Sequence, residues 1–120
     1  MSEQNLDWMR RDIENAREKY LLENPVISVF DALRKYTEEF ESTLDSEHEI
    51  AVMLTSFGGI QLFHAQTISY SEPNLITFYG VTPEGEKVQL VQHVSQLNFM
   101  LKAVKKIEEK PFRVGFVHSE

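Results

Sequence analysis

The hydrophobic pattern of this 120-residue chain changes near residue 45, and that change constrains the fold more than any other feature. Before the acidic link Asp45 to Glu49, apolar residues recur every three or four positions, as in amphipathic helices. After it, short apolar runs are separated by Gly, Pro and Asn, as in antiparallel strands joined by tight turns. We therefore expect a single α+β domain over 1–120, with an N-terminal helix in 1–24 and the core in 25–118.

The first helix is predicted to carry a narrow apolar stripe, with alternating steps of three and four residues: Leu6, Met9, Ile13, Ala16 and Tyr20. Asn5 can cap this helix, and Asp7 would then lie in its first turn. A stripe this narrow resembles the seam between two helices rather than a face that covers a core. We therefore predict an interface at Leu6, Met9, Ile13 and Tyr20, and a homo-oligomer or a complex with a protein partner.

A second helix is predicted to begin at Asn24 and Pro25, because Asn suits the cap and Pro the first helical position. Its apolar stripe is wide and aromatic: Val26, Val29, Phe30, Leu33, Tyr36, Phe40 and Leu44. A wide stripe of this kind favours packing on the core.

Four strands should follow as an antiparallel meander: Ile50 to Phe57, Ile60 to Ser69, Leu75 to Val81, and Lys87 to Val94. Gly58-Gly59 is typical of a tight hairpin, and Glu72-Pro73-Asn74 makes the next turn. Thr82 to Gly85 has the residues of a type I turn closed by a glycine with positive φ.

The segment 95–107 fits either a helix or a strand. In the helical interpretation Ser95 caps it, Leu97, Leu101, Val104 and Ile107 form one face, and Pro111 ends it. With that interpretation the fold has two N-terminal helices, a four- to five-stranded antiparallel sheet and one C-terminal helix. A last strand is expected at Phe112 to Val117.

Composition excludes several kinds of chemistry. The chain has no cysteine, which excludes disulfides, zinc ribbons, iron–sulfur clusters and thiol catalysis. Its net charge of −7 lies entirely in residues 1–50, which hold thirteen acidic and six basic residues, and this disfavours non-specific nucleic-acid binding. With no apolar run near the ~20 residues of a membrane span and a polar start, we expect a cytoplasmic protein that does not enter membranes.

No catalytic, metal or cofactor motif is present. The four histidines, His48, His64, His93 and His118, lack the i, i+4 spacing of helical zinc sites. His64 is expected to be a partly buried imidazole with a hydrogen-bond partner. Gly58-Gly59 lies between strands, so a hairpin explains it better than a phosphate loop. We therefore expect neither an enzyme nor a bound cofactor.

The densest polar cluster surrounds the end of the fourth strand. The predicted ligand-binding residues are Gln92, His93, Ser95, Gln96 and Asn98, with Tyr79 as a possible stacking ring. Uncharged amides, hydroxyls and imidazoles hydrogen-bond to ligands more readily than they react with them. An equally compatible interpretation is that Gln92, His93 and Ser95 close the strand and cap the next element.

Several strings resemble an uncharacterised family of small bacterial and phage proteins. They are Phe40-Glu41, His48-Glu49, Ser56-Phe57-Gly58-Gly59, Phe78-Tyr79-Gly80, Val88 to Asn98 and Arg113-Val114-Gly115-Phe116. This resemblance covers residues 26–117, leaves out the first helix and implies no activity.

A second, weaker similarity is to the Sm-like (Hfq-type) RNA-binding barrels, through His93-Val94-Ser95 and the strand that starts at Ile50. It implies an N-terminal helix, a bent five-stranded barrel, ring assembly and RNA binding. The chain departs from that family in its second front helix, its acidity and its lack of the usual acidic residue after the second-strand bend.

Two functions follow from these patterns. The first is a non-enzymatic oligomeric binding or regulatory module that holds a peptide, small ligand or partner around Gln92, His93 and Ser95. The alternative is a single-stranded RNA or nucleotide binder whose phosphate contacts come from four basic residues: Lys102, Lys105, Lys106 and Arg113. The basic residues have a simpler interpretation as a solvated surface. A hydrolase built on His64 or His93 ranks last.

Overall fold

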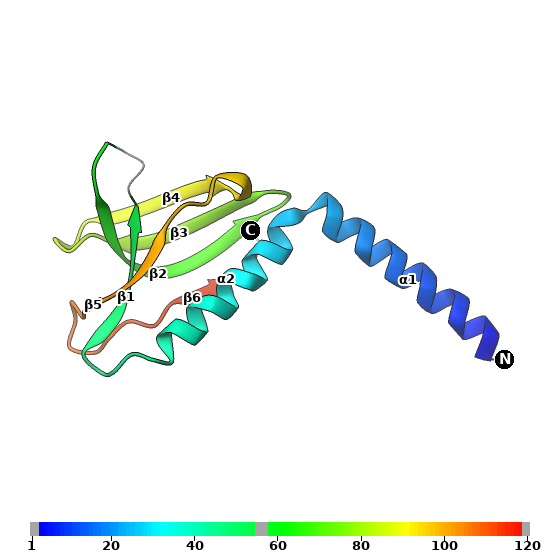
Figure 1. Cartoon of the computed structure of the whole chain (residues 1–120), viewed down its shortest axis with the longest axis horizontal. Helices are drawn as coiled ribbons and strands as arrows, with labels where there is room; N and C mark the ends of the chain where they lie inside the picture. The colour runs from blue at the N-terminus through cyan, green and yellow to red at the C-terminus, as the bar shows by residue number, and fades with distance from the viewer. Residues whose placement is uncertain (1–2, 55–57, 119–120) are drawn as a thin grey trace.

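The structure is a computed structural model that describes residues 3–54 and 58–118. The described residues form two α-helices, a short 3-10 helix and six strands, which confirms the α+β class (Figure 1). The helices are α1 (Glu3–Glu23) and α2 (Pro25–Glu41), and the 3-10 helix is η1 (Val94–Gln96). The strands are β1 (His48–Leu54), β2 (Gln61–Ser71), β3 (Leu75–Val81), β4 (Lys87–His93), β5 (Met100–Lys105) and β6 (Gly115–Val117).

Helix α1 is an arm that projects from the rest of the molecule, with the N-terminus at its far end (Figure 1). The chain therefore measures 63 × 32 × 21 Å, and its radius of gyration of 18.4 Å exceeds the roughly 14 Å of a compact 120-residue domain. The helix begins at Glu3, so Asn5 lies inside it and the prediction that Asn5 caps it is wrong.

Helix α2 begins where the sequence predicts, with Asn24 at the N-cap and Pro25 at the first helical position. The Asn24 side chain makes no capping bond and instead donates from Nδ2 to the Tyr20 carbonyl at 2.9 Å. Val26 and Phe30 are fully buried against the sheet, and the helix ends at Glu41, before Leu44. Together, α2 and one face of the sheet enclose the core.

The sheet order is β4-β3-β2-β1-β5, and all neighbours on this path are antiparallel. The predicted hairpin between β1 and β2 is confirmed, while the predicted strand end at Phe57 lies outside the described residues. Strand β3 has the predicted bounds, and Gly85 has the expected positive φ of 88°. The short C-terminal strand β6 is also present and pairs with β2 in parallel.

The predicted C-terminal helix is wrong, because residues 100–105 form strand β5. This strand is hydrogen-bonded to β1, with Ile50 opposite Ala103 and Val52 opposite Leu101. As a strand, the segment satisfies the backbone groups along β1 that a helix would leave exposed at an edge. The rest of the expected helix is the single turn η1 and an extended segment, in which the ring of Phe99 packs 5.0 Å from that of Phe78.

Candidate functional site

The turn that links β4 to β5 is organised by His93. Its Nδ1 accepts the Ser95 backbone N–H at 3.1 Å and lies 2.8 Å from Ser95 Oγ. Because a backbone N–H can only donate, Nδ1 is the acceptor, and the proton of the neutral ring is on Nε2. His93, rather than Ser95, is therefore the N-cap of η1. The prediction that Ser95 caps this element is wrong, because His93 supplies the cap and Ser95 is the residue that is capped, and Nε2–H of His93 remains available to donate to a ligand.

Gln92 has an unsatisfied polar atom. Its side chain lies on the opposite face of β4 from that of His93, and Gln92 is paired with Ile76 of β3. Among the residues that the structure describes, Gln92 Oε1 is the buried side-chain oxygen that has no hydrogen-bond partner. An amide oxygen in this state loses hydration without compensation, so a donor that reached it would be favoured.

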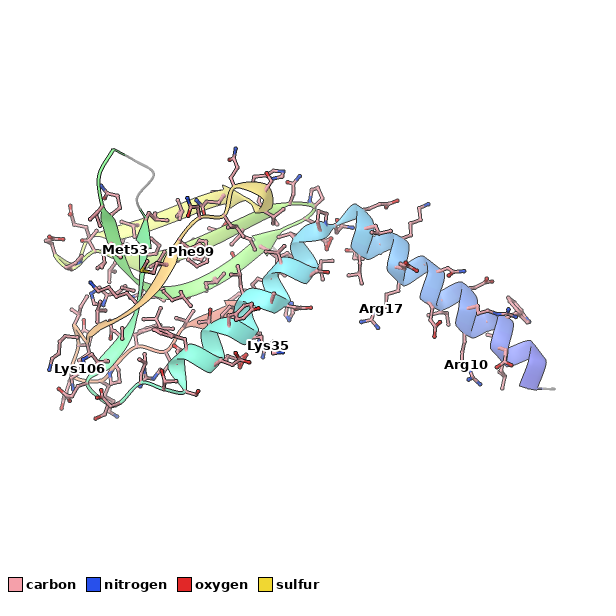
Figure 2. The ribbon with its side chains drawn as sticks, viewed as in Figure 1. Arg10, Arg17, Lys35, Met53, Phe99 and Lys106 are labelled. Atoms are coloured by element: carbon pink, nitrogen blue, oxygen red, sulfur yellow. The ribbon has the colours of Figure 1, made fainter. Side chains whose placement is uncertain are left out.

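The other predicted ligand-binding residues do not converge on His93. Asn98 lines a small pocket together with Met53, Phe99 and Met100, on the side of the molecule where β1 and β5 meet (Figure 2). Gln96 is exposed and makes no side-chain hydrogen bond within the described part of the chain.

Tyr79 is separated from His93 along the sheet. Tyr79 is paired with Gln89, whereas His93 is paired with Leu75, so the two lie four residues apart along the strands. At about 3.3 Å per residue this separation is roughly 13 Å, too far for both rings to hold one small ligand.

The basic residues proposed for phosphate binding are also dispersed. Lys106 Nζ lies 2.9 Å from Glu47 Oε2, and this hydrogen bond holds the pKa of Glu47 below its usual value. Arg113 donates to the carbonyls of His48 at 2.9 Å and Asp45 at 3.1 Å. Lys102 and Lys105 are exposed, but their odd spacing places them on opposite faces of β5.

Two carboxylates that no sequence pattern indicated hold the C-terminal segment. Glu49 Oε1 accepts the Phe112 N–H at 2.9 Å, and Glu41 Oε2 accepts the Val114 N–H at 2.7 Å. Burial raises the pKa of Glu41, even though the bond from Val114 opposes this shift. Glu49 ends the acidic link Asp45 to Glu49, and Glu41 follows Glu38 and Glu39, so neither carboxylate stands out in the sequence.

Glu49 also binds His64, whose Nδ1 donates to Glu49 Oε2 at 2.6 Å, with both side chains buried. This confirms the expectation that His64 is a buried imidazole with a partner. Because both oxygens of Glu49 have donors, the pair has a structural explanation and needs no catalytic one.

The apolar stripe of the arm is left open. Leu6, Met9 and Ile13 are 39%, 43% and 65% exposed. Tyr20, the fourth predicted interface residue, is 47% exposed, and its hydroxyl donates to the Glu72 carboxylate of the same chain. This bond raises the pKa of Tyr20 and ties the base of the arm to the turn between β2 and β3.

Residues 3–54 and 58–118 contain neither a metal-binding cluster nor a membrane-spanning helix. No cluster of three or more metal-binding side chains occurs there. No helix in this part of the chain has the length and apolar character needed to cross a membrane.

Comparison with known proteins matches residues 21–117 to a family of unknown function, DUF6173. This range contains α2 and the whole sheet and leaves out nearly all of the arm. No curated protein and no solved structure matches the chain.

Proposed function

The chain belongs to the DUF6173 family, which has no assigned activity, so we propose a function from the geometry of the molecule. The protein is a non-enzymatic, homo-oligomeric binding module. Its arm α1 joins copies of the chain, and the turn between β4 and β5 holds a peptide or a small polar ligand. The observation that carries this proposal is the exposed apolar stripe of the arm.

An arm of this kind needs a partner for its stability. Most of the stability of a protein helix comes from packing its apolar face, and helical propensity alone is marginal in water. None of the residues that the structure describes buries Leu6, Met9 or Ile13, which remain 39%, 43% and 65% exposed. Covering such side chains contributes roughly 25 cal/mol for each Å² of apolar surface. A second helix along the stripe would supply that cover.

The turn between β4 and β5 supplies the groups for a ligand. His93 Nε2–H is a donor that the turn itself does not use, and the exposed Ser95 and Gln96 add further polar groups. These are neutral groups without a neighbouring nucleophile, so they favour binding over reaction.

Assembly is tested by the mass of the protein in solution. We expect Ile13→Glu to lower the mass to that of one chain, because it buries a charge in the stripe. Asn15→Glu adds the same charge near the opposite side of the helix and should leave the mass unchanged. Light scattering after size-exclusion chromatography measures both variants. If the wild-type protein has the mass of one chain, the proposed assembly through α1 is wrong.

Ligand binding is tested with His93 variants. Native mass spectrometry of gently purified protein would identify a retained ligand, which His93→Ala should release. His93→Asn keeps an oxygen that can accept the Ser95 N–H but lacks Nε2–H, so it should keep the fold and also release the ligand. Ligand retained by both variants would show that His93 does not bind it.

RNA binding is the second candidate, and the strand at 100–105 favours it. With β5, helix α2 is followed by five strands that form one antiparallel path, and β2 has a bulge between Ala65 and Thr67. The Sm-like resemblance implies such an architecture. The dispersed basic residues disfavour RNA binding. Several phosphate contacts would lower the affinity for single-stranded RNA by about tenfold or more between 50 and 200 mM salt. A salt dependence of this size would support this candidate over the first.

A further inference from the structure

We infer that the partner of each arm is the arm of a second copy, aligned in parallel and in register. This inference rests on the proposed assembly through α1 and adds the identity and the orientation of the partner. The observations that carry it are the spacing of the apolar residues and the charges that flank them.

The apolar spacing is that of a two-stranded coiled coil. Leu6 and Ile13 are seven residues apart, as are Met9 and Ala16, so they occupy the a and d positions of successive heptads. We call these four residues the seam. In a parallel, in-register pair each seam residue meets its own counterpart in the other copy.

The charges beside the seam follow the same repeat. Arg10 and Arg17 lie on one side of it, at e positions, and Figure 2 shows them projecting from the same side of the arm. Asp12 and Lys19 lie on the other side, at g positions. Four of the neighbouring side chains already form pairs within the arm: Arg10 with Asp7 at 3.7 Å, and Lys19 with Glu23 at 3.9 Å.

Asp12 and Arg17, in contrast, have no ion-pair partner among the described side chains of the arm. Both are exposed, and neither forms an ion pair within 4.0 Å in the part of the chain that the structure describes. In a parallel coiled coil the g residue of one helix faces the e residue five positions later on the other. Asp12 therefore faces Arg17 of the second copy, and symmetry repeats the contact. The remaining flanking positions bring no like charges together.

Antiparallel pairing is less compatible with these charges. The register that buries all four seam residues brings Arg10 beside Arg10 and Asp12 beside Asp12 of the second copy. A shift of one heptad places Arg10 beside Arg17, which offsets the attraction between Asp12 and Lys19. Flanking pairs contribute little affinity at an exposed site, but their signs select orientation and register.

Orientation is measured by disulfide cross-linking, for which the chain is suited because it has no cysteine of its own. We expect Met9→Cys and Ala16→Cys each to form a cross-linked dimer with itself in a glutathione redox buffer. Asn15→Cys, on the opposite side of the arm, is the matched control and should not cross-link. An equimolar mixture of Leu6→Cys and Ala16→Cys detects antiparallel pairing, because that arrangement alone brings these positions together.

The charge pair is measured by exchanging its signs. Asp12→Arg and Arg17→Asp should each weaken the dimer about tenfold, because two attractive contacts become two repulsive ones. The double variant restores opposite charges and should return the dissociation constant to near the wild-type value. Circular dichroism checks that every variant keeps the helix.

The outcomes separate this inference from the proposed function. A dimer that Ile13→Glu disrupts, with cross-links only in the Leu6→Cys and Ala16→Cys mixture, overturns the parallel arrangement and keeps assembly through the arm. A double variant as weak as the single ones overturns the Asp12 to Arg17 contact. A dimer insensitive to Ile13→Glu, or a monomer at every concentration, overturns both.

Discussion

Burial sets the direction of the pKa shift of Glu41, the last residue of α2. Its carboxylate is desolvated, which raises its pKa, yet it must accept the Val114 N–H to hold the C-terminal segment. Desolvation outweighs the hydrogen bond, so the ionised form of Glu41 is less favourable in the folded chain than in the unfolded one. The same carboxylate therefore positions β6 and makes folding sensitive to pH.

Replacing Glu41 by Gln should remove this sensitivity. A pKa raised on folding gives stability that is fully present below the ordinary value of 4.5 and is lost as the pH rises through the folded value. The amide cannot ionise, and its oxygen can still accept from Val114. The free energy of unfolding of Glu41→Gln, relative to wild type, should therefore increase as the pH rises from 4 to 7. Urea titrations at several pH values measure this difference.

The control for this prediction is Glu39→Gln, which changes an exposed carboxylate of the same helix. Its difference from wild type should not show the increase expected of Glu41→Gln. A constant difference between Glu41→Gln and wild type over the whole range would show that Glu41 has the same pKa in both states.

At the scale of elements, local patterns predicted most of the fold. The start of α2, the bounds of β3 and the glycine turn at Gly85 depend on residues close together in the sequence, and all are present. The predicted fold had a helix where β5 lies, with a strand as the open alternative, because the partner of β5 is remote: Ala103 is paired with Ile50, more than fifty residues earlier. The apolar residues of 97–107 also fit a helical repeat, so only the exposed edge of β1 decides between helix and strand.

In the candidate site, too, contacts between residues close in the sequence could be predicted and contacts between remote residues could not. The capping of η1 by His93 involves residues two apart, and the sequence analysis included it as an alternative. The contact of Glu49 with Phe112 spans 63 residues, and a carboxylate in an acidic stretch gives no sign of it. Both faces of β1 are buried, so the continuous apolar run that follows Glu49 was the signal that its side chain could be covered.

Strands β2 and β3 approach each other closely at Gly80. A Cβ at this position would overlap the His64 carbonyl oxygen and would lie 2.7 Å from Cδ2 of Phe63. Because a backbone oxygen cannot move alone, Gly80→Ala should force the strands apart and lower the free energy of unfolding by about 3 kcal/mol. Gly59→Ala is the control, because a Cβ there would meet no atom of the described residues within 4 Å. Equal urea midpoints for the two variants would contradict the close approach.

At the scale of the whole molecule, the arm makes few contacts with the rest of the chain, which consists of α2 and the sheet. The Tyr20 hydroxyl bonded to Glu72 fixes the base of α1, and the family match begins at residue 21, beside that bond. Within the part of the arm whose side chains the structure describes, no residue belongs to the buried core. Helix α2 and the sheet therefore hold the core, and the exposed stripe of the arm is left for the assembly that we propose.

This division predicts different responses to protein concentration. Association of folded chains stabilises them by mass action, so the melting temperature of the full chain should rise with concentration. A chain shortened to begin at Lys19 keeps Tyr20 and the core, but it lacks the seam of Leu6, Met9, Ile13 and Ala16. Its melting temperature should be independent of concentration and equal to that of full-length Ile13→Glu, the matched control. Scanning calorimetry over a hundredfold range of concentration measures all three proteins. A shortened chain whose melting temperature still rose with concentration would place assembly on the sheet instead of the arm.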